Sequence, residues 1–317
     1  MTPQLDAHYQ MVLRALLDGR VVPVLGAGVN RCGRPAGAAW DRGRYLPDGA
    51  ELARHLASYS AYPDPDPADL VRVSQYFAVM LGAGPLYDEL RELFDVDYPP
   101  TPIHRFLATL PAAMRRRGFT SPSRLIVTTN YDDALERSFS EAGEPYDLVA
   151  YITVGENAGS FLHYPPDGEA ILIEVPNEYG ALTLDERTVI LKLHGAVDRN
   201  NAEHDSYVIT EDHYIEYLTR TELSGLLPVK LVAKLRRSHF LFLGYSLRDW
   251  NLRVILQRIW GRQPFEEQYK SWAIRKDPSR LEERLWRNRN VDNLNVDLDT
   301  YVRALSDAVF APEVLRS

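Results

Sequence analysis

The sequence contains a single cysteine, Cys32, among its 317 residues. One cysteine excludes a disulfide within the chain, and it also excludes a zinc site built on Cys-x-x-Cys pairs. Disulfides persist in oxidising compartments and are rare in the cytosol. We therefore expect a cytoplasmic protein whose fold needs no covalent cross-link.

Long apolar runs are also missing. No stretch of 18 or more apolar residues occurs, so no transmembrane helix is expected. Asp6, His8 and Gln10 interrupt the apolar positions near the start of the sequence, so no secretory signal is expected either. The formal net charge is −8. This acidic balance argues against direct nucleic-acid binding, which depends on a basic face.

Several common catalytic motifs are absent. No Gly-x-x-x-x-Gly-Lys-Ser/Thr loop occurs, which disfavours a P-loop ATPase. No Gly-x-Ser-x-Gly elbow occurs, so the nucleophile turn of an α/β-hydrolase is missing too. His204 and His213 lie near acidic residues but lack the spacing of metal ligands. We therefore expect no bound metal.

The composition is that of a soluble globular protein, with 45% hydrophobic and 25% charged residues. Strands and helices alternate along most of the chain. Strand-like apolar stretches occur at residues 21–25, 124–129, 170–175, 188–193, 239–243 and 270–275, and helical spacing at residues 4–18, 133–141, 212–218, 223–235, 250–260 and 298–310. This alternation predicts an α/β fold with a Rossmann-like, doubly wound and mainly parallel sheet.

One long segment departs from the alternation. Residues 50–118 have helical periodicity broken by proline-rich turns, with predicted helices at residues 50–58, 70–81, 85–94 and 102–114. We therefore predict a mostly helical insertion at 50–118, with residues 1–49 and 119–317 forming the core.

Four of the predicted strands end in small or polar residues. Ligands of open α/β sheets bind at the carboxyl ends of the strands, so these ends are candidate site residues. The first is Gly26-Ala27-Gly28, followed by Asn30. Two glycines let the backbone approach a phosphate closely. A plain strand-to-helix turn would use the same residues, and Arg31 occupies the third glycine position of a Gly-x-Gly-x-x-Gly motif.

The second strand end is Asn130-Tyr131-Asp132. An asparagine amide can both donate to and accept from a hydroxyl or a water, and a neighbouring carboxylate can accept from an amide. The alternative is a structural role, because Asn130 or Asp132 could cap the helix that follows.

The third strand end is His194-Gly195. A histidine here suits proton exchange with a sugar hydroxyl, although it could instead be tied to a backbone carbonyl. The fourth is Gly244-Tyr-Ser246, with Asp249 beyond it. Ser246 can bind a phosphate or a ribose, whereas Asp249 could cap the next helix. Taken together, the four ends predict one nucleotide site.

In their order along the chain, these motifs resemble those of sirtuin-type domains. The first resembles Gly-Ala-Gly-x-Ser, with Asn30 in place of serine, and Thr128-Thr-Asn-Tyr-Asp132 resembles Thr-Gln-Asn-Ile-Asp. His194-Gly195 matches the catalytic His-Gly, and Gly244-Tyr-Ser246 stands where sirtuins have Gly-Thr-Ser. The chain most resembles the bacterial sirtuin-like domains of anti-phage defence systems.

Two departures from the wider family distinguish between its branches. Protein deacylases usually carry a four-cysteine zinc module, which one cysteine cannot build. The Gly-Ile-Pro-Asp-Phe-Arg loop that helps to hold the nicotinamide end has no clear match. Both departures favour the NAD-hydrolysing branch over the deacylase branch.

The resemblance implies NAD+ as substrate and cleavage of the nicotinamide–ribose bond to nicotinamide and ADP-ribose. The role implied is a regulated, NAD-depleting effector of antiviral defence by abortive infection. Asn130 would orient the attacking water, and His194 would bond the ribose hydroxyls and relay a proton. The remaining predicted NAD-binding residues are Gly26, Ala27, Gly28 and Asn30 near the pyrophosphate, Tyr131 and Asp132 at the carboxamide, Gly195 beside the histidine, and Gly244, Ser246 and Asp249 on the adenosine side.

Three alternatives stay open from the sequence. They are an NAD-dependent protein deacylase, a non-catalytic module that senses NAD or ADP-ribose, and a transferase that makes cyclic ADP-ribose. A freely active NAD hydrolase would poison its host, so the resemblance also implies control by partners. These would be further copies of the chain in a homo-oligomer, or a companion such as a HerA-type ATPase or a short Argonaute.

Overall fold

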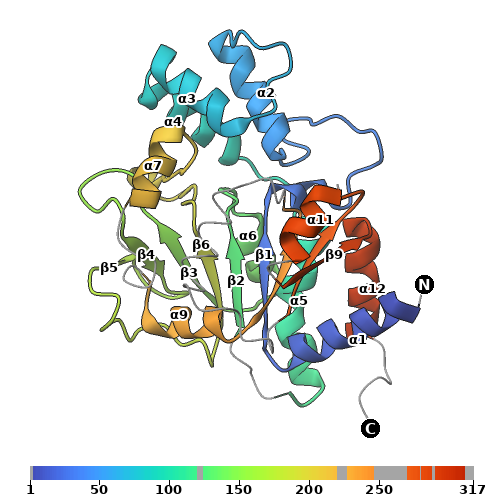
Figure 1. The fold of residues 1–317 in the computed structure, drawn as a ribbon. Coiled ribbons are helices and arrows are strands. Elements are labelled where there is room, and N and C mark those ends of the chain that lie inside the picture. Colours follow the sequence, from blue (N-terminus) through green and yellow to red (C-terminus); the bar gives the residue numbers. More distant parts are fainter. Residues whose placement is uncertain are drawn as a thin grey trace.

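The computed structural model describes residues 3–119, 124–219, 227–245, 270–278, 280–287 and 290–310. Its described strands form one sheet in the order β5-β4-β3-β6-β2-β1-β7-β8-β9 (Figure 1). They are β1 (Val21–Leu25), β2 (Arg124–Thr128), β3 (Tyr146–Tyr151), β4 (Phe161–Tyr164), β5 (Ile171–Ile173), β6 (Thr188–Lys192), β7 (His239–Leu243), β8 (Ser271–Arg275) and β9 (Val291–Asn295). All neighbours from β3 to β9 pair in parallel, and β4 pairs antiparallel with β3 and β5. The predicted mainly parallel α/β sheet is confirmed.

Helices cover both faces of the sheet and one of its ends. They are α1 (Pro3–Leu17), α2 (Gly49–Ser60), α3 (Leu70–Leu81), α4 (Ala83–Phe94), α5 (Pro102–Arg116), α6 (Ala134–Glu141), α7 (Glu211–Thr219), α9 (Val229–Arg236), α11 (Arg280–Arg287) and α12 (Leu298–Phe310). Within the described residues, no helix is long and apolar enough to cross a membrane.

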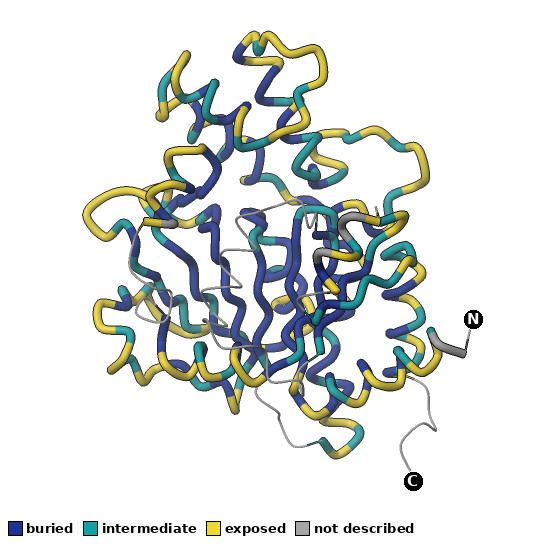
Figure 2. Tube along the Cα trace, viewed as in Figure 1, coloured by how far each residue is buried: buried dark blue, intermediate teal, exposed yellow. Residues whose placement is uncertain are grey.

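Alternation along the strands divides the core into two layers. Val22 and Val24 of β1 pack with residues of α7, α9 and α11, whereas Val21 and Leu25 pack with residues of α1, α5, α6 and α12. Successive side chains of a strand point to opposite faces, which is why one apolar strand can serve both layers. Figure 2 shows the central strands as the most continuously buried part of the chain.

A third cluster joins the helices α2, α3 and α4, which we call the cap, to the end of the sheet. It contains Leu56, Phe77 and Leu90 of the cap together with Tyr131 and Tyr207 of the core. In Figure 1 the cap stands over the end at which β1, β2 and β6 finish. The predicted helical segment 50–118 also includes α5, which packs against the sheet rather than in the cap. The proposed division of the chain into domains stays a prediction.

The sequence pattern missed strands at both edges of the sheet. β3 contains Asp147, β4 is four residues long, and β9 has the polar sequence Val-Asp-Asn-Leu-Asn. Asp and Asn disfavour strands on their own, so pairing with a neighbour decides such segments. Residues 270–275 were expected to hold the last strand, but β9 follows β8, so that expectation was wrong. The helix predicted at 250–260 lies outside the described residues.

The strands β1 and β7 meet where the chain changes direction across the sheet. The chain leaves β1 toward β2 on one side and leaves β7 toward β8 on the other, which makes their carboxyl ends the topological switch point. The loops there touch closely. A Cβ on Gly28 would lie 2.5 Å from the carbonyl oxygen of Gly244, and a Cβ on Gly244 would lie 2.2 Å from the amide nitrogen of Val29. Glycine is therefore needed for the two backbones to approach each other.

We expect Gly244→Ala to destabilise the protein by about 3 kcal/mol, because the new methyl group meets backbone that cannot easily yield. Gly143→Ala is a matched control. Its φ is +66° against +64° for Gly244, but nothing lies within 4 Å of a Cβ at Gly143. The control should cost only the strain of the left-handed conformation, about 1 kcal/mol. Urea denaturation of both variants measures the difference, and equal losses would contradict the close approach.

Candidate functional site

A cavity of about 960 Å³ lies between the strand ends and the cap. This volume is at the upper end of the range for small-molecule sites, about 300–1,000 Å³. The four strands predicted to end at one site, β6, β2, β1 and β7, are neighbours in the sheet. The predicted residues that line the cavity are Gly26, Ala27, Gly28, Asn30, Asn130, Tyr131, Asp132, His194 and Gly244. Ser246 and Asp249 lie outside the described residues.

Asn130 lines this cavity and has a side-chain carbonyl with no partner in the described part of the chain. Its backbone N–H donates to Thr128 Oγ1 at 3.0 Å, and its side-chain Nδ2 reaches only a long contact of 3.5 Å with the carbonyl oxygen of Gly26. The residue is 7% exposed, and Oδ1 is buried without a partner among the described residues. A buried polar atom without a partner is costly, so this oxygen is suited to a ligand or a water.

Asp132 combines the capping role with an available oxygen. Oδ1 accepts the backbone N–H of Ala134 at 3.1 Å, at the start of α6, while Oδ2 is buried without a described partner. Tyr131 differs, because its hydroxyl donates to the carbonyl oxygen of Val208 at 2.8 Å. Its ring also packs edge-on against Phe94 and Tyr207. The Tyr131 hydroxyl is therefore engaged within the fold, whereas Asp132 keeps one oxygen for a ligand.

Lys192 stabilises the loop at residues 130–132 through hydrogen bonds to its backbone. The residue is fully buried, and its Nζ donates to the carbonyl oxygen of Asp132 at 2.5 Å, to that of Tyr131 at 3.3 Å and to Glu136 Oε1 at 2.7 Å. Burial raises the pKa of Glu136, and the ammonium of Lys192 opposes that rise. Sequence reasoning did not identify this residue. The signal was a lysine inside the apolar strand Thr188–Lys192.

His194 is buried with an unpaired ring nitrogen. The residue is 3% exposed, its Nε2 has no partner among the described residues, and Tyr214 packs edge-on at 5.4 Å between ring centroids. Burial lowers the pKa of His194 to about 3, because a charged imidazolium would lose its hydration. The imidazole is therefore neutral near pH 7, and a neutral imidazole carries one donor and one acceptor.

Gly195 and Asn30 are two further residues that the sequence predicted for the site. Gly195 has φ +79°, and a Cβ there would lie 2.1 Å from the carbonyl oxygen of Ser206, so it allows that segment to cross close behind the histidine. It is not a lining residue of the cavity. Asn30 does line it: Nδ2 donates to the carbonyl oxygen of Pro47 at 2.9 Å, and Oδ1 is buried without a described partner.

The glycine turn after β1 uses most of its amides within the fold. The N–H of Gly26 donates to the carbonyl oxygen of Leu243 at 3.0 Å, and that of Gly28 to the carbonyl oxygen of Gly244 at 2.9 Å. The short 3₁₀ helix Ala27–Arg31 follows. The two glycines thus have a packing role that the sequence motif did not reveal.

The unpaired atoms define what the site can bind. Three are acceptor oxygens, on Asn30, Asn130 and Asp132, and the fourth is the ring nitrogen of His194. Such a wall is complementary to groups that donate hydrogen bonds, such as sugar hydroxyls and a primary amide. It can also hold a water in a fixed orientation.

Comparisons with known proteins show which family this chain resembles. The sequence profile of the SIR2-like domain matches residues 124–294. Defense-associated sirtuin 2 of Bacillus subtilis is 25% identical over 217 residues, covering 68% of this chain and 17% of that protein. NAD(+) hydrolase ThsA of Acinetobacter baumannii (strain 532279) is 29% identical over 197 residues, covering 60% of this chain and 31% of that protein.

A second NAD(+) hydrolase ThsA, from Enterococcus faecium, is 28% identical over 193 residues, covering 60% of this chain and 32% of that protein. The match thus spans between 17% and 32% of the length of these curated relatives.

We expect the imidazole of His194 to stay neutral from pH 8 down to pH 5. Its pKa is about 3 in the fold against 6.5 for a free side chain, so the unfolded chain takes up the proton first as the pH falls. As the pH falls from about 6.5 to about 3, this group therefore lowers the free energy of unfolding by about 1.4 kcal/mol for each pH unit. Long-range ¹H–¹⁵N spectra would follow the ring, assigned by its loss in His194→Gln. A midpoint near pH 6.5 would contradict the burial.

We expect Lys192→Met to destabilise the protein by about 3–5 kcal/mol, because it leaves the carboxylate of Glu136 buried and unpaired. Combining it with Glu136→Leu should recover part of that loss. Recovery is partial because the carbonyl oxygens of Tyr131 and Asp132 still lose their donor.

The control for this test is Lys270→Met. Lys270 pairs with Asp292 at 2.6 Å, with side chains 45% and 43% exposed, so its loss should cost less than about 1 kcal/mol. Urea denaturation measures all three variants. A loss in Lys192→Met no larger than that of the control would show that the buried ammonium does not support the loop.

Proposed function

The chain belongs to the family of SIR2-like domains, and we propose that it hydrolyses NAD+ at the nicotinamide–ribose bond, giving nicotinamide and ADP-ribose. The observation that carries the proposal is that Asn30, Asn130, Asp132 and His194 line one cavity, and that each has a buried polar atom without a partner among the described residues. NAD+ supplies the matching donors, since its riboses carry hydroxyls and its nicotinamide carries a primary amide. The two relatives named NAD(+) hydrolase ThsA support the same substrate.

The chemistry needs positioning more than proton transfer. Nicotinamide leaves as a neutral molecule, so the reaction needs no strong general acid. The anomeric carbon becomes cationic as the bond breaks, and a water must wait on its open face. Fixing that water and the ribose supplies the entropy that an encounter in solution would cost.

Asn130 is the residue proposed to orient the water. Its Oδ1 can accept from the water, and the backbone bond to Thr128 Oγ1 fixes the side chain relative to β2. Oδ2 of Asp132 would accept from the nicotinamide amide. Each role uses an atom that the fold leaves unpaired, so binding the substrate repays the desolvation of these atoms.

His194 is proposed to bind a ribose hydroxyl as a neutral base. Because burial holds its pKa at about 3, the ring stays neutral and can accept a hydrogen bond across the physiological pH range. A pKa this low makes the ring a weak base, so its proposed contribution is to hold and orient the ribose hydroxyl.

The biological role proposed is an NAD-depleting effector of antiviral defence. The relative named Defense-associated sirtuin 2 supports this context. An enzyme that consumes NAD+ without control would harm its own cell, so we propose that assembly or a partner protein holds its activity. Further copies of the chain, or a companion defence protein, would serve that purpose.

We expect Asn130→Ala to reduce nicotinamide release from NAD+ by about 10²–10⁴ while the protein stays folded. The control is Asn157→Ala, because that side chain is exposed in the connection between β3 and β4. Chromatography of nicotinamide and ADP-ribose measures the rate. Undiminished release by Asn130→Ala would overturn the assignment. Adding an acetylated peptide separates the reactions, since O-acetyl-ADP-ribose would identify a deacylase.

A further inference from the structure

The charges around the cavity are mostly negative. Among its described lining residues, the carboxylates are those of Asp48, Asp69, Asp132 and Glu211, and the one cation is Arg72. A dinucleotide brings two further negative charges in its pyrophosphate. Placing these beside carboxylates is unfavourable unless a cation or several donors face them.

Other cationic side chains near the cavity already form hydrogen bonds or ion pairs within the protein. Lys192 is bound to Glu136 and to the loop carbonyls below the site. Arg34 donates to Glu51 Oε1 at 2.5 Å and to the carbonyl oxygen of Leu46 at 2.7 Å. Arg31 lies 3.4 Å from Asp48 Oδ2. None of these side chains lines the cavity, so none is placed to meet a phosphate.

Arg72 is both fixed and available. It lies in the first turn of α3, and its backbone N–H donates to Oδ1 of the capping residue Asp69 at 3.2 Å. That bond holds the backbone and occupies one oxygen of the Asp69 carboxylate. The residue is exposed, and its guanidinium forms no ion pair in the part of the chain that the structure describes.

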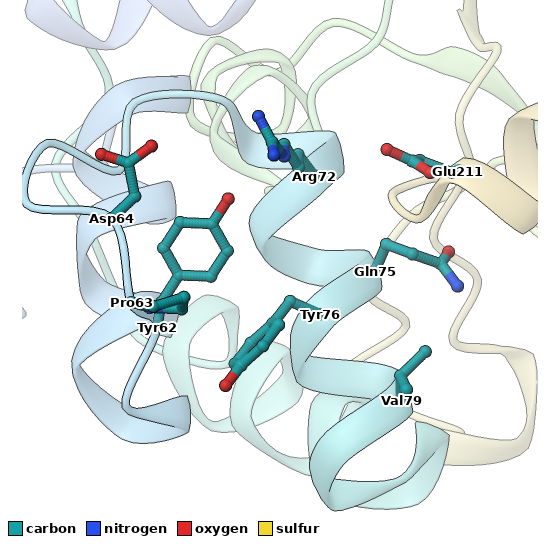
Figure 3. A pocket seen from close by; sticks show the side chains of 8 residues that line it. All are labelled: Tyr62, Pro63, Asp64, Arg72, Gln75, Tyr76, Val79 and Glu211. Atoms are coloured by element: carbon teal, nitrogen blue, oxygen red, sulfur yellow. The ribbon is translucent and has the colours of Figure 1, made fainter.

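Arg72 lines two neighbouring pockets. Arg72 and Glu211 line the main cavity, and both also line a second pocket of about 540 Å³ beside Tyr62 and Tyr76. Figure 3 shows Arg72 on α3 and Glu211 on α7, both lining this second pocket. A ligand that extends from Asn130 and His194 in the main cavity toward the second pocket would therefore pass the guanidinium.

We propose that Arg72 binds the pyrophosphate of the dinucleotide and so selects phosphate-bearing substrates. The inference rests on the proposed function. The glycine turn supports it, because the N–H groups of Gly26 and Gly28 already donate to the carbonyl oxygens of Leu243 and Gly244, so neither is available to a phosphate. A guanidinium can bind a phosphate directly, since its planar fork matches two phosphate oxygens at once.

The test compares Arg72→Gln and Arg72→Lys with the wild type. Calorimetry with ADP-ribose measures binding, and turnover of NAD+ is compared with that of nicotinamide riboside, which has no pyrophosphate. Losing a charge-assisted hydrogen bond should weaken ADP-ribose binding about 10- to 100-fold in Arg72→Gln. KM for NAD+ should rise with kcat nearly unchanged, kcat/KM for nicotinamide riboside should stay constant, and Arg72→Lys should recover part of the affinity.

The matched control is Arg54→Gln. Arg54 lies on α2 of the same cap, is 53% exposed and does not line the cavity. It should bind ADP-ribose as the wild type does. An affinity of Arg72→Gln for ADP-ribose within twofold of the wild type would overturn the proposal, even if NAD+ is hydrolysed. A wild type that binds ADP-ribose without hydrolysing NAD+ would overturn the hydrolase alone, and the Arg72 variants would then be judged by binding.

Discussion

The site depends on one buried cation. Lys192 brings its ammonium to the end of β6 and bonds there to two carbonyl oxygens of the loop after β2 and to the carboxylate of Glu136 on α6. β6 is thus tied at one atom to the loop after β2 and to the helix that follows this loop, which lie about 60 residues earlier in the sequence. A buried ammonium has no water to solvate it, so these partners cannot be given up one at a time. This requirement fixes the backbone at Asn130 and Asp132, two residues that line the cavity.

Two further constraints build the cavity around that loop. The glycines after β1 and β7 allow the backbones at the switch point to touch, which closes the floor of the site. The cap closes the other side and is held at several points. Arg91 of α4 bonds Asp205 at 2.8 Å, and Gln75 of α3 bonds Asp212 through both its amide oxygen and its amide nitrogen. Since these contacts join the cap to α7 and to the segment between His194 and α7, the polar wall and its cover are positioned together.

The sequence pattern located the central strands well because each is buried on both faces. An apolar run without alternation then stands out, and β1, β2, β6 and β7 were found within a residue at each end. The strands β3, β4 and β9, which lie outside the central strands, carry polar residues, and their partners in the sheet, rather than their own pattern, make them strands. Of the candidate site, the residues after four strands could be named from their types. Lys192 and Arg72 could not, because a lysine in a strand and an arginine on a helix acquire meaning only from what lies beside them.

The sequence by itself therefore determined the class of fold, the central strands and the chemical groups at their ends, since burial and periodicity are local properties of the chain. Only the tertiary structure decided which atoms of those groups are free. The hydroxyl of Tyr131 and the amides of Gly26 and Gly28 are consumed by partners distant in sequence. The oxygens of Asn30, Asn130 and Asp132 are left without partners among the residues that the structure describes. Hydrogen bonds are shared out among neighbours in space, and order along the chain does not specify those neighbours.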